Sequence, residues 1–225
     1  MLINILYEDN SILIIKKPAG LATQSANIRQ PDCVSLLKDH LKRTDSGSNA
    51  EPYVGVIHRL DQPVAGILVF AKNKRAAAAL SSQVQSTLMN KHYSALVEGV
   101  VDVTEETVLT NLMYKDGKIS KAVIVDDTDR NVPGVKIQEA TLKYRTEHIF
   151  ESENRTRLSI DLITGRFHQI RAQLSNIGHP IVGDRKYGAV TTYSSGIALI
   201  ADKLEFVHPD TGEKVEKVVD FSFSL

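Results

Sequence analysis

The chain has 225 residues, 42% hydrophobic and 24% charged, which is the composition of an ordinary globular protein long enough to bury a sizeable core. Its 27 basic and 27 acidic side chains balance, so it lacks the overall basic excess that usually marks a nucleic-acid-binding protein. The opening segment contains neither the apolar core of a signal peptide nor a run long enough to cross a membrane, and we expect no membrane partner.

The first half of the chain is predicted to combine short strands with helices. Two β-rich runs, 3–9 and 11–17, are separated by Asp9-Asn10, a pair typical of a hairpin turn. Asn73 precedes an alanine-rich run that it is expected to cap. The predicted elements after the hairpin are a loop over 18–32, a helix over 33–43, an exposed loop over 44–52, a strand over 66–72 and a helix from 74 to about 88.

The second half is predicted to be richer in strands. The run "HYSALVEG" at 92–99 alternates as a strand does, and several β-rich runs follow from 105 to 163. Residues 165–180 are predicted to form a helix that stops at Gly178. Short strands return from 197 to the end. This pattern indicates an α/β protein of the α+β type, as one domain or as two small lobes that share a core.

Cys33 is the only cysteine, so no disulfide can form within the chain, and a reducing cytoplasm is the expected location. No histidine lies near it in sequence. We therefore interpret Cys33 as a small buried apolar residue rather than a nucleophile.

Several common kinds of site are missing from the sequence. It has no Gly-x-Ser-x-Gly elbow and no Gly-x-Gly-x-x-Gly turn, and "GDRKYGAV" lacks the Lys-Ser/Thr that a phosphate loop needs. The seven histidines are scattered, with no two at ligand spacing on one helix. We expect no metal and no cofactor, so that an enzyme built on this chain would work with side chains alone.

The first unusual stretch is "GVIHRLDQPVAG" at 55–66, just before an apolar run. Pro63 drives the residue before it toward extended geometry, and Gly66 permits a tight backbone. Asp61 is therefore expected on a rigid loop at the end of a strand. By itself it fits the role of a turn residue or ion-pair partner as well as it fits that of a reactive carboxylate.

The second unusual stretch is "LITGRFHQIRAQL", where Thr164-Gly165 ends a strand and several polar side chains crowd the predicted first turns of a helix. An arginine on a fixed element is suited to pair with a carboxylate or to hold a phosphate through its planar fork. The polar side chains in this stretch are Arg166, His168, Gln169 and Arg171. So many are more than one structural salt bridge requires.

Together, "HRLDQPVAG", "KHYSALVEG" and "TGRFHQIRAQL…GHPIVGDRKYG" resemble the RNA pseudouridine synthases, specifically the RluA-like branch. The resemblance runs from "ILYEDNSILIIKKPAGL" to "IALIADKLEFVHPDTGE", which is nearly the whole chain. It implies a single catalytic domain over 1–225 with the pseudouridine synthase fold, a largely antiparallel sheet flanked by helices with a central catalytic cleft. Family members often carry an extra N-terminal RNA-binding domain; this chain is expected to be a minimal member without one.

The resemblance also assigns roles. Asp61 matches the catalytic aspartate that attacks the uridine, and Tyr93 matches the active-site tyrosine that packs on the base and helps remove the carbon-bound proton. Arg171 matches the basic residue that pairs with the aspartate, and Arg59 matches the arginine that fills the space left by the extruded nucleotide. The wider set expected to contact substrate is Arg59, His58, Arg166, His168 and Gln169, with the two histidines acting as hydrogen-bonding scaffold rather than as acids or bases.

These roles are chemically coherent. A nucleophilic carboxylate must be ionised, and a neighbouring arginine holds it so. An enzyme that acts on a base takes it out of the stack, and an aromatic platform with an inserted guanidinium offsets part of that cost. The expected partner is RNA, a ribosomal or transfer RNA stem-loop, and the expected assembly is a monomer.

Two alternatives stay open: a catalytically idle RNA-binding protein of the same fold, and a carboxylate-based hydrolase that cleaves the glycosidic bond outright. The sequence departs from the family at Val64-Ala65, where Thr-Ser is common, and at Gln173, where histidine is frequent. Neither change touches Asp61, Tyr93 or Arg171.

Overall fold

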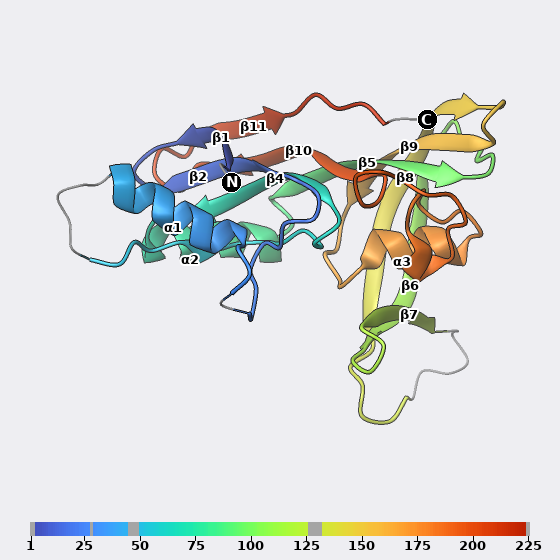
Figure 1. The fold of residues 1–225 in the computed structure, drawn as a ribbon, viewed down its shortest axis with the longest axis horizontal. Coiled ribbons are helices and arrows are strands. Elements are labelled where there is room, and N and C mark those ends of the chain that lie inside the picture. The colour runs from blue at the N-terminus through green and yellow to red at the C-terminus, as the bar shows by residue number, and fades with distance from the viewer. Residues whose placement is uncertain (1–2, 28, 45–49, 126–131, 224–225) are drawn as a thin grey trace. The chain divides into compact units, whose positions relative to one another are not determined.

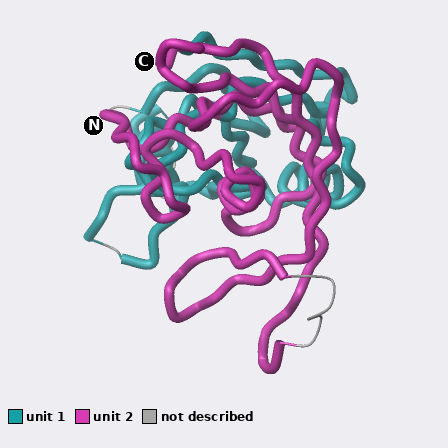
Figure 2. The backbone as a smooth tube through the Cα atoms, turned by 90° about the vertical axis from the view of Figure 1, so that its right-hand side faces the viewer, with its two compact units in different colours: residues 1–90, 201–221 teal, residues 91–200, 222–225 magenta. Residues whose placement is uncertain are grey.

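The computed structural model describes residues 3–27, 29–44, 50–125 and 132–223. The chain divides into two compact units, drawn in different colours in Figure 2: residues 1–90 with 201–221 form unit 1, and residues 91–200 with 222–225 form unit 2. The single domain expected over 1–225 stays a prediction. Part of the exposed loop predicted over 44–52 lies outside the described residues.

Unit 1 contains a small sheet with two helices, and Figure 1 shows both helices on the same side of its strands. The strands are β1 (Asn4–Glu8), β2 (Ile12–Lys17), β3 (Gly55–Val56), β4 (Ala65–Ala71), most of β10 (Leu199–Val207) and β11 (Lys214–Val218); the helices are α1 (Cys33–Thr44) and α2 (Lys74–Gln85). The strand order is β1-β2-β4-β10, with β3 paired to β4 and β11 paired to β10. The pairings β1–β2, β2–β4, β3–β4 and β10–β11 are antiparallel.

Local chemistry explains these elements. Asp9 Oδ1 accepts the backbone N–H groups of Ser11 and Ile12 at 2.7 and 2.8 Å, which closes the predicted hairpin turn. Asn73 caps α2 as predicted, because its Oδ1 accepts the N–H of Ala76 at 2.9 Å. The apolar runs of β2 and β4 are fully buried and form the core of unit 1.

Unit 2 is an antiparallel sheet with one α-helix against it. Its strands are nearly all of β5 (Asn90–Glu98), β6 (Thr107–Asp116), β7 (Lys121–Val125), β8 (Gln138–Phe150) and β9 (Arg155–Leu162); its helices are α3 (Gln169–Asn176) and the 3-10 helix η1 (Arg185–Tyr187). The order is β5-β9-β8-β6-β7, and each pairing is antiparallel. Helix α3 packs on β7 and η1. The α+β class with a largely antiparallel sheet is confirmed.

The start of α3 differs from the prediction. The helix begins at Gln169, so Arg166 and His168 lie in the turn before it and not in its first turns. The reason is that His168 takes a left-handed backbone with φ of 52°, which interrupts helical continuation. The predicted stop at Gly178 is correct: its N–H bonds the Ser175 carbonyl, and the next N–H bonds the Leu174 carbonyl, which is a Schellman motif.

None of the helices in the described part of the chain is both long and apolar enough to cross a membrane.

Candidate active site

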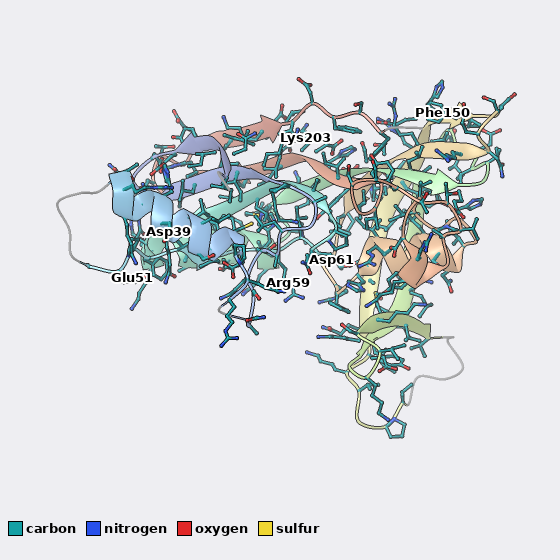
Figure 3. The ribbon with its side chains drawn as sticks, in the orientation of Figure 1. Asp39, Glu51, Arg59, Asp61, Phe150 and Lys203 are labelled. Carbon is teal, nitrogen blue, oxygen red and sulfur yellow. The ribbon has the colours of Figure 1, made fainter. Side chains whose placement is uncertain are left out.

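In unit 1, the loop between β3 and β4 carries three of the predicted site residues, His58, Arg59 and Asp61. Figure 3 labels Arg59, which is exposed, and Asp61, which is half-buried. Leu60 and Val64 on either side of Asp61 are only 5% and 2% exposed, so the loop is anchored in the core around the carboxylate. This arrangement presents a charged group on a fixed backbone.

A buried lysine is hydrogen-bonded to the backbone of this loop. Lys17 is fully buried, and its ammonium donates to the carbonyl oxygens of Pro18, Leu21 and Gln62 at 3.1, 2.7 and 3.1 Å. Burial lowers the pKa of Lys17 to about 8, while the negative charge of Asp61 acts to raise it. Because Gln62 directly follows Asp61, the ammonium fixes the backbone of the predicted nucleophile.

Further hydrogen bonds clamp the same loop. The N–H of Gly20 donates to the Gln62 carbonyl at 2.8 Å, and the Gln62 amide returns a bond to the Gly20 carbonyl at 3.0 Å. Thr23 Oγ1 donates to the Leu60 carbonyl at 3.0 Å and accepts the Leu60 N–H at 3.2 Å. The end of β2 and the segment after it, "KKPAGLAT", thus hold the Asp61 loop in place through hydrogen bonds.

His58 is part of the scaffold of this loop. Its Nε2 accepts the backbone N–H of Val69, in β4, at 3.3 Å. That contact agrees with the predicted hydrogen-bonding role, and a contact with substrate stays a prediction.

Cys33 is buried as expected. Burial raises the pKa of its thiol to about 11. The thiol therefore stays protonated at neutral pH and is unsuited to nucleophilic attack.

In unit 2, Arg171 forms a buried, two-pronged ion pair that the sequence did not reveal. Its Nε and one terminal nitrogen donate to the two oxygens of Asp184 at 2.6 and 2.8 Å. The two side chains are 6% and 1% exposed. A planar fork held in this way has one fixed orientation. The predicted pairing of Arg171 with Asp61 stays a prediction.

Tyr187 joins the arginine to the turn before α3. The guanidinium of Arg171 lies 5.0 Å from the centre of the Tyr187 ring. The tyrosine hydroxyl accepts the N–H of Ala122 at 2.7 Å and bonds Nδ1 of His168 at 3.0 Å. His168 also stacks on Phe167, with ring centres 3.8 Å apart. The left-handed backbone of His168 is therefore held by packing and by a hydrogen bond.

Gln169 holds the turn that leads into α3. Its side-chain oxygen accepts the Arg166 N–H at 3.0 Å and the Thr164 hydroxyl at 2.8 Å, and the residue is only 3% exposed. Arg166 itself donates from Nε to the Glu139 carbonyl at 2.9 Å. These contacts are structural; contacts of Arg166, His168 and Gln169 with substrate stay predictions.

Tyr93 lies on β5 opposite Ile160 of β9 and is 5% exposed. The structure thus gathers His58, Arg59 and Asp61 on one loop of unit 1. It gathers the remaining predicted residues of unit 2 on β5, on α3 and in the turn before α3. Sequence reasoning missed Lys17 and Asp184, each of which holds a predicted site residue in place.

The family model described as RNA pseudouridylate synthase matches residues 11–176, which is most of the chain and includes Asp61, Tyr93 and Arg171. The chain belongs to this family. RNA pseudouridine synthases are isomerases that convert uridine to pseudouridine.

Curated relatives from bacteria support the assignment. The uncharacterized RNA pseudouridine synthase YhcT of Bacillus subtilis is 34% identical, over 95% of this chain and 67% of its own length. The ribosomal large subunit pseudouridine synthase C of Buchnera aphidicola is 31% identical, over 97% of this chain and 67% of its own. The dual-specificity RNA pseudouridine synthase RluA of Vibrio vulnificus is 34% identical, over 91% of this chain and 78% of its own.

Two human structures share the pseudouridine synthase fold. RNA pseudouridylate synthase domain containing 1 superposes with a TM-score of 0.73 at 21% identity, covering 97% of this chain and 83% of the other. RNA pseudouridylate synthase domain containing 4 gives 0.71 at 23% identity, covering 97% and 88%.

Proposed function

We propose that this pseudouridine synthase isomerises specific uridines in structured RNA, with Asp61 as the nucleophile. The observation that carries the proposal is the loop of Asp61, whose backbone is fixed by a buried ammonium and by paired hydrogen bonds while the residue is only half-buried. A structural turn does not need so much support.

In the proposed reaction the Asp61 carboxylate attacks ribose C1′ of the uridine and forms an ester bond as the bond between uracil N1 and C1′ breaks. The uracil stays in the site, its carbon 5 bonds C1′ as the ester bond to Asp61 breaks, and the proton on carbon 5 is then lost. Tyr93 packs on the base and assists this proton loss, Arg171 keeps Asp61 ionised, and Arg59 fills the space left by the flipped nucleotide. The only atom that leaves is that proton, and N1 takes up a proton from water in exchange. Side chains therefore suffice for the reaction.

The proposed substrate is a ribosomal or transfer RNA stem-loop, and the proposed working form is a cytoplasmic monomer. The names of the relatives support this choice of RNA, since one is a ribosomal large subunit enzyme and another a dual-specificity RNA enzyme. RNA recognition of this type uses bases that splay out of a loop.

The test is release of tritium to water from unmodified ribosomal and transfer RNA transcripts labelled at carbon 5 of uracil. Release without free uracil supports isomerisation. Free uracil among the products would instead indicate a hydrolase. Binding of both RNAs without any release would favour the catalytically idle RNA-binding protein.

A further inference from the structure

Lys91, on β5, carries a charge that the fold does not satisfy. Its side chain is partly buried, and burial lowers the pKa of its ammonium. Within the described residues, however, its Nζ forms no hydrogen bond or ion pair. Lys17, the buried lysine of unit 1, shows the contrast with its three carbonyl acceptors. Removing a cation from water without a partner costs free energy, and a bound anion would offset that cost at Lys91.

The position of Lys91 points to substrate. Side chains two residues apart on a strand share a face, so Lys91 lies on the same face of β5 as Tyr93. His92 between them points to the other face, where its Nε2 bonds the Ser159 hydroxyl at 2.8 Å. The ammonium is therefore one strand step from the tyrosine assigned to the base.

Gly165 lies next to this ammonium and has no side chain that could cover it. A Cβ at that position would lie 3.4 Å from Lys91 Nζ, so any longer side chain there would cover the charge. Gly165 has an ordinary backbone φ, in contrast to the glycines with a positive φ, and its lack of a side chain is not required by backbone geometry. The turn before α3 thus adds no side chain over this cation, which lies on the face of β5 that carries Tyr93.

We propose that Lys91 binds a backbone phosphate next to the target uridine. A compact ammonium acts as a point charge for phosphate, and its three donors need no preset direction. This inference rests on the proposed function, because it takes RNA as the ligand. It also explains why the fold keeps a partly desolvated charge: the phosphate supplies the missing partner when RNA binds.

The test measures binding of an unmodified RNA transcript as a function of salt, in an Asp61→Asn background so that no turnover occurs. The transcript is the ribosomal or transfer RNA from which the wild type releases most tritium, or, if none releases any, the one that it binds most tightly. Lys91→Met should weaken binding on the order of tenfold. It should also lower the slope of log Kd against log salt by about one. Lys91→Arg should restore the slope.

The matched control is Lys203→Met. Lys203 lies on β10, and its ammonium is already engaged by Glu205 and Glu216 at 2.7 and 3.0 Å, so the salt slope should not change. Folding is checked by thermal unfolding, where Lys91→Met should be no less stable than its parent, since an unpaired charge is removed.

Two results would overturn the phosphate contact. In the first, Lys91→Met leaves the salt slope unchanged but lowers the single-turnover rate at saturating enzyme, measured in the chain with Asp61 intact. That result would indicate that the ammonium contacts the uracil and not a phosphate. An unchanged slope and rate would exclude Lys91 from substrate binding. If the wild type releases no tritium from any RNA, the proposed reaction fails, whereas the salt slope still tests the phosphate contact.

Discussion

At the scale of single residues, one ammonium fixes the backbone next to Asp61. Lys17 is buried, and its three N–H donors meet three backbone carbonyls, one of them adjacent to Asp61. We interpret Lys17 as a positioning residue, which holds the loop of the proposed nucleophile without touching substrate.

Lys17→Met should lower both stability and rate. It takes a donor from three carbonyls, of which that of Gln62 keeps the Gly20 N–H while those of Pro18 and Leu21 lose the ammonium. This loss costs about 1–3 kcal/mol of unfolding free energy and loosens the backbone after Asp61. Urea unfolding and single-turnover rates measure the two effects. Lys16→Met is the matched control, because among the residues that the structure describes the Lys16 ammonium donates to the Asp220 carbonyl alone, at an exposed position. Equal losses in both variants would show that Lys17 has no special role.

The pH profile separates positioning from mere stability. The unfolded chain keeps the Lys17 proton up to a pKa of 10.5, whereas the folded protein loses it near 8, so burial of the charge costs stability below pH 8. That cost is relieved as pH rises from about 8 to 10.5, and stability rises accordingly. The rate should move the other way, because a neutral amine has only two donors for three carbonyls. A basic limb near pH 8 that persists in Lys17→Met would contradict the assignment.

At the scale of elements, β4 and β10 approach each other through a glycine. A Cβ at Gly66 would lie 2.3 Å from the Ala201 carbonyl oxygen, and the backbone there has φ of 132°. The strand that follows the Asp61 loop therefore depends on this residue for its place in the sheet of unit 1.

Gly66→Ala should destabilise the protein by several kcal/mol, because the clash is with backbone that cannot move aside. Gly20→Ala provides the comparison: it has φ of 85° but nothing within 4 Å of an added Cβ, so it carries backbone strain alone. Thermal unfolding of both variants measures the difference. Equal shifts in Tm would mean that the close approach of the strands is unimportant.

The sequence predicted those elements whose causes are local. The Asn73 cap and the Gly178 stop depend on residues within one helical turn, and both are confirmed. The predicted start of α3 was wrong because His168 is held in a left-handed conformation by Tyr187, nineteen residues away. Asp184 was missed for the same reason, since its partner Arg171 is distant in sequence. Lys17 was missed because lysine is rarely buried unless it is paired.

At the scale of the whole molecule, overall charge says little about RNA, because many charges already engage each other. In the basic run at 72–75, Lys72 pairs with Glu8 at 2.8 Å and Arg75 with Asp210 at 2.6 Å. Affinity for RNA in a neutral protein must then come from a few charges left open at the right place. Lys91 is the one that we propose.

We propose that the chain isomerises RNA uridine through Asp61. Tritium release from RNA labelled at carbon 5 of uracil tests it most directly, with wild type, Asp61→Asn and Asp39→Asn compared at equal RNA occupancy. Asp39 is an exposed carboxylate on α1, labelled in Figure 3, and its substitution removes the same charge. We predict release by wild type and Asp39→Asn and none by Asp61→Asn, whose binding of RNA should persist. Release that survives in Asp61→Asn would contradict the account.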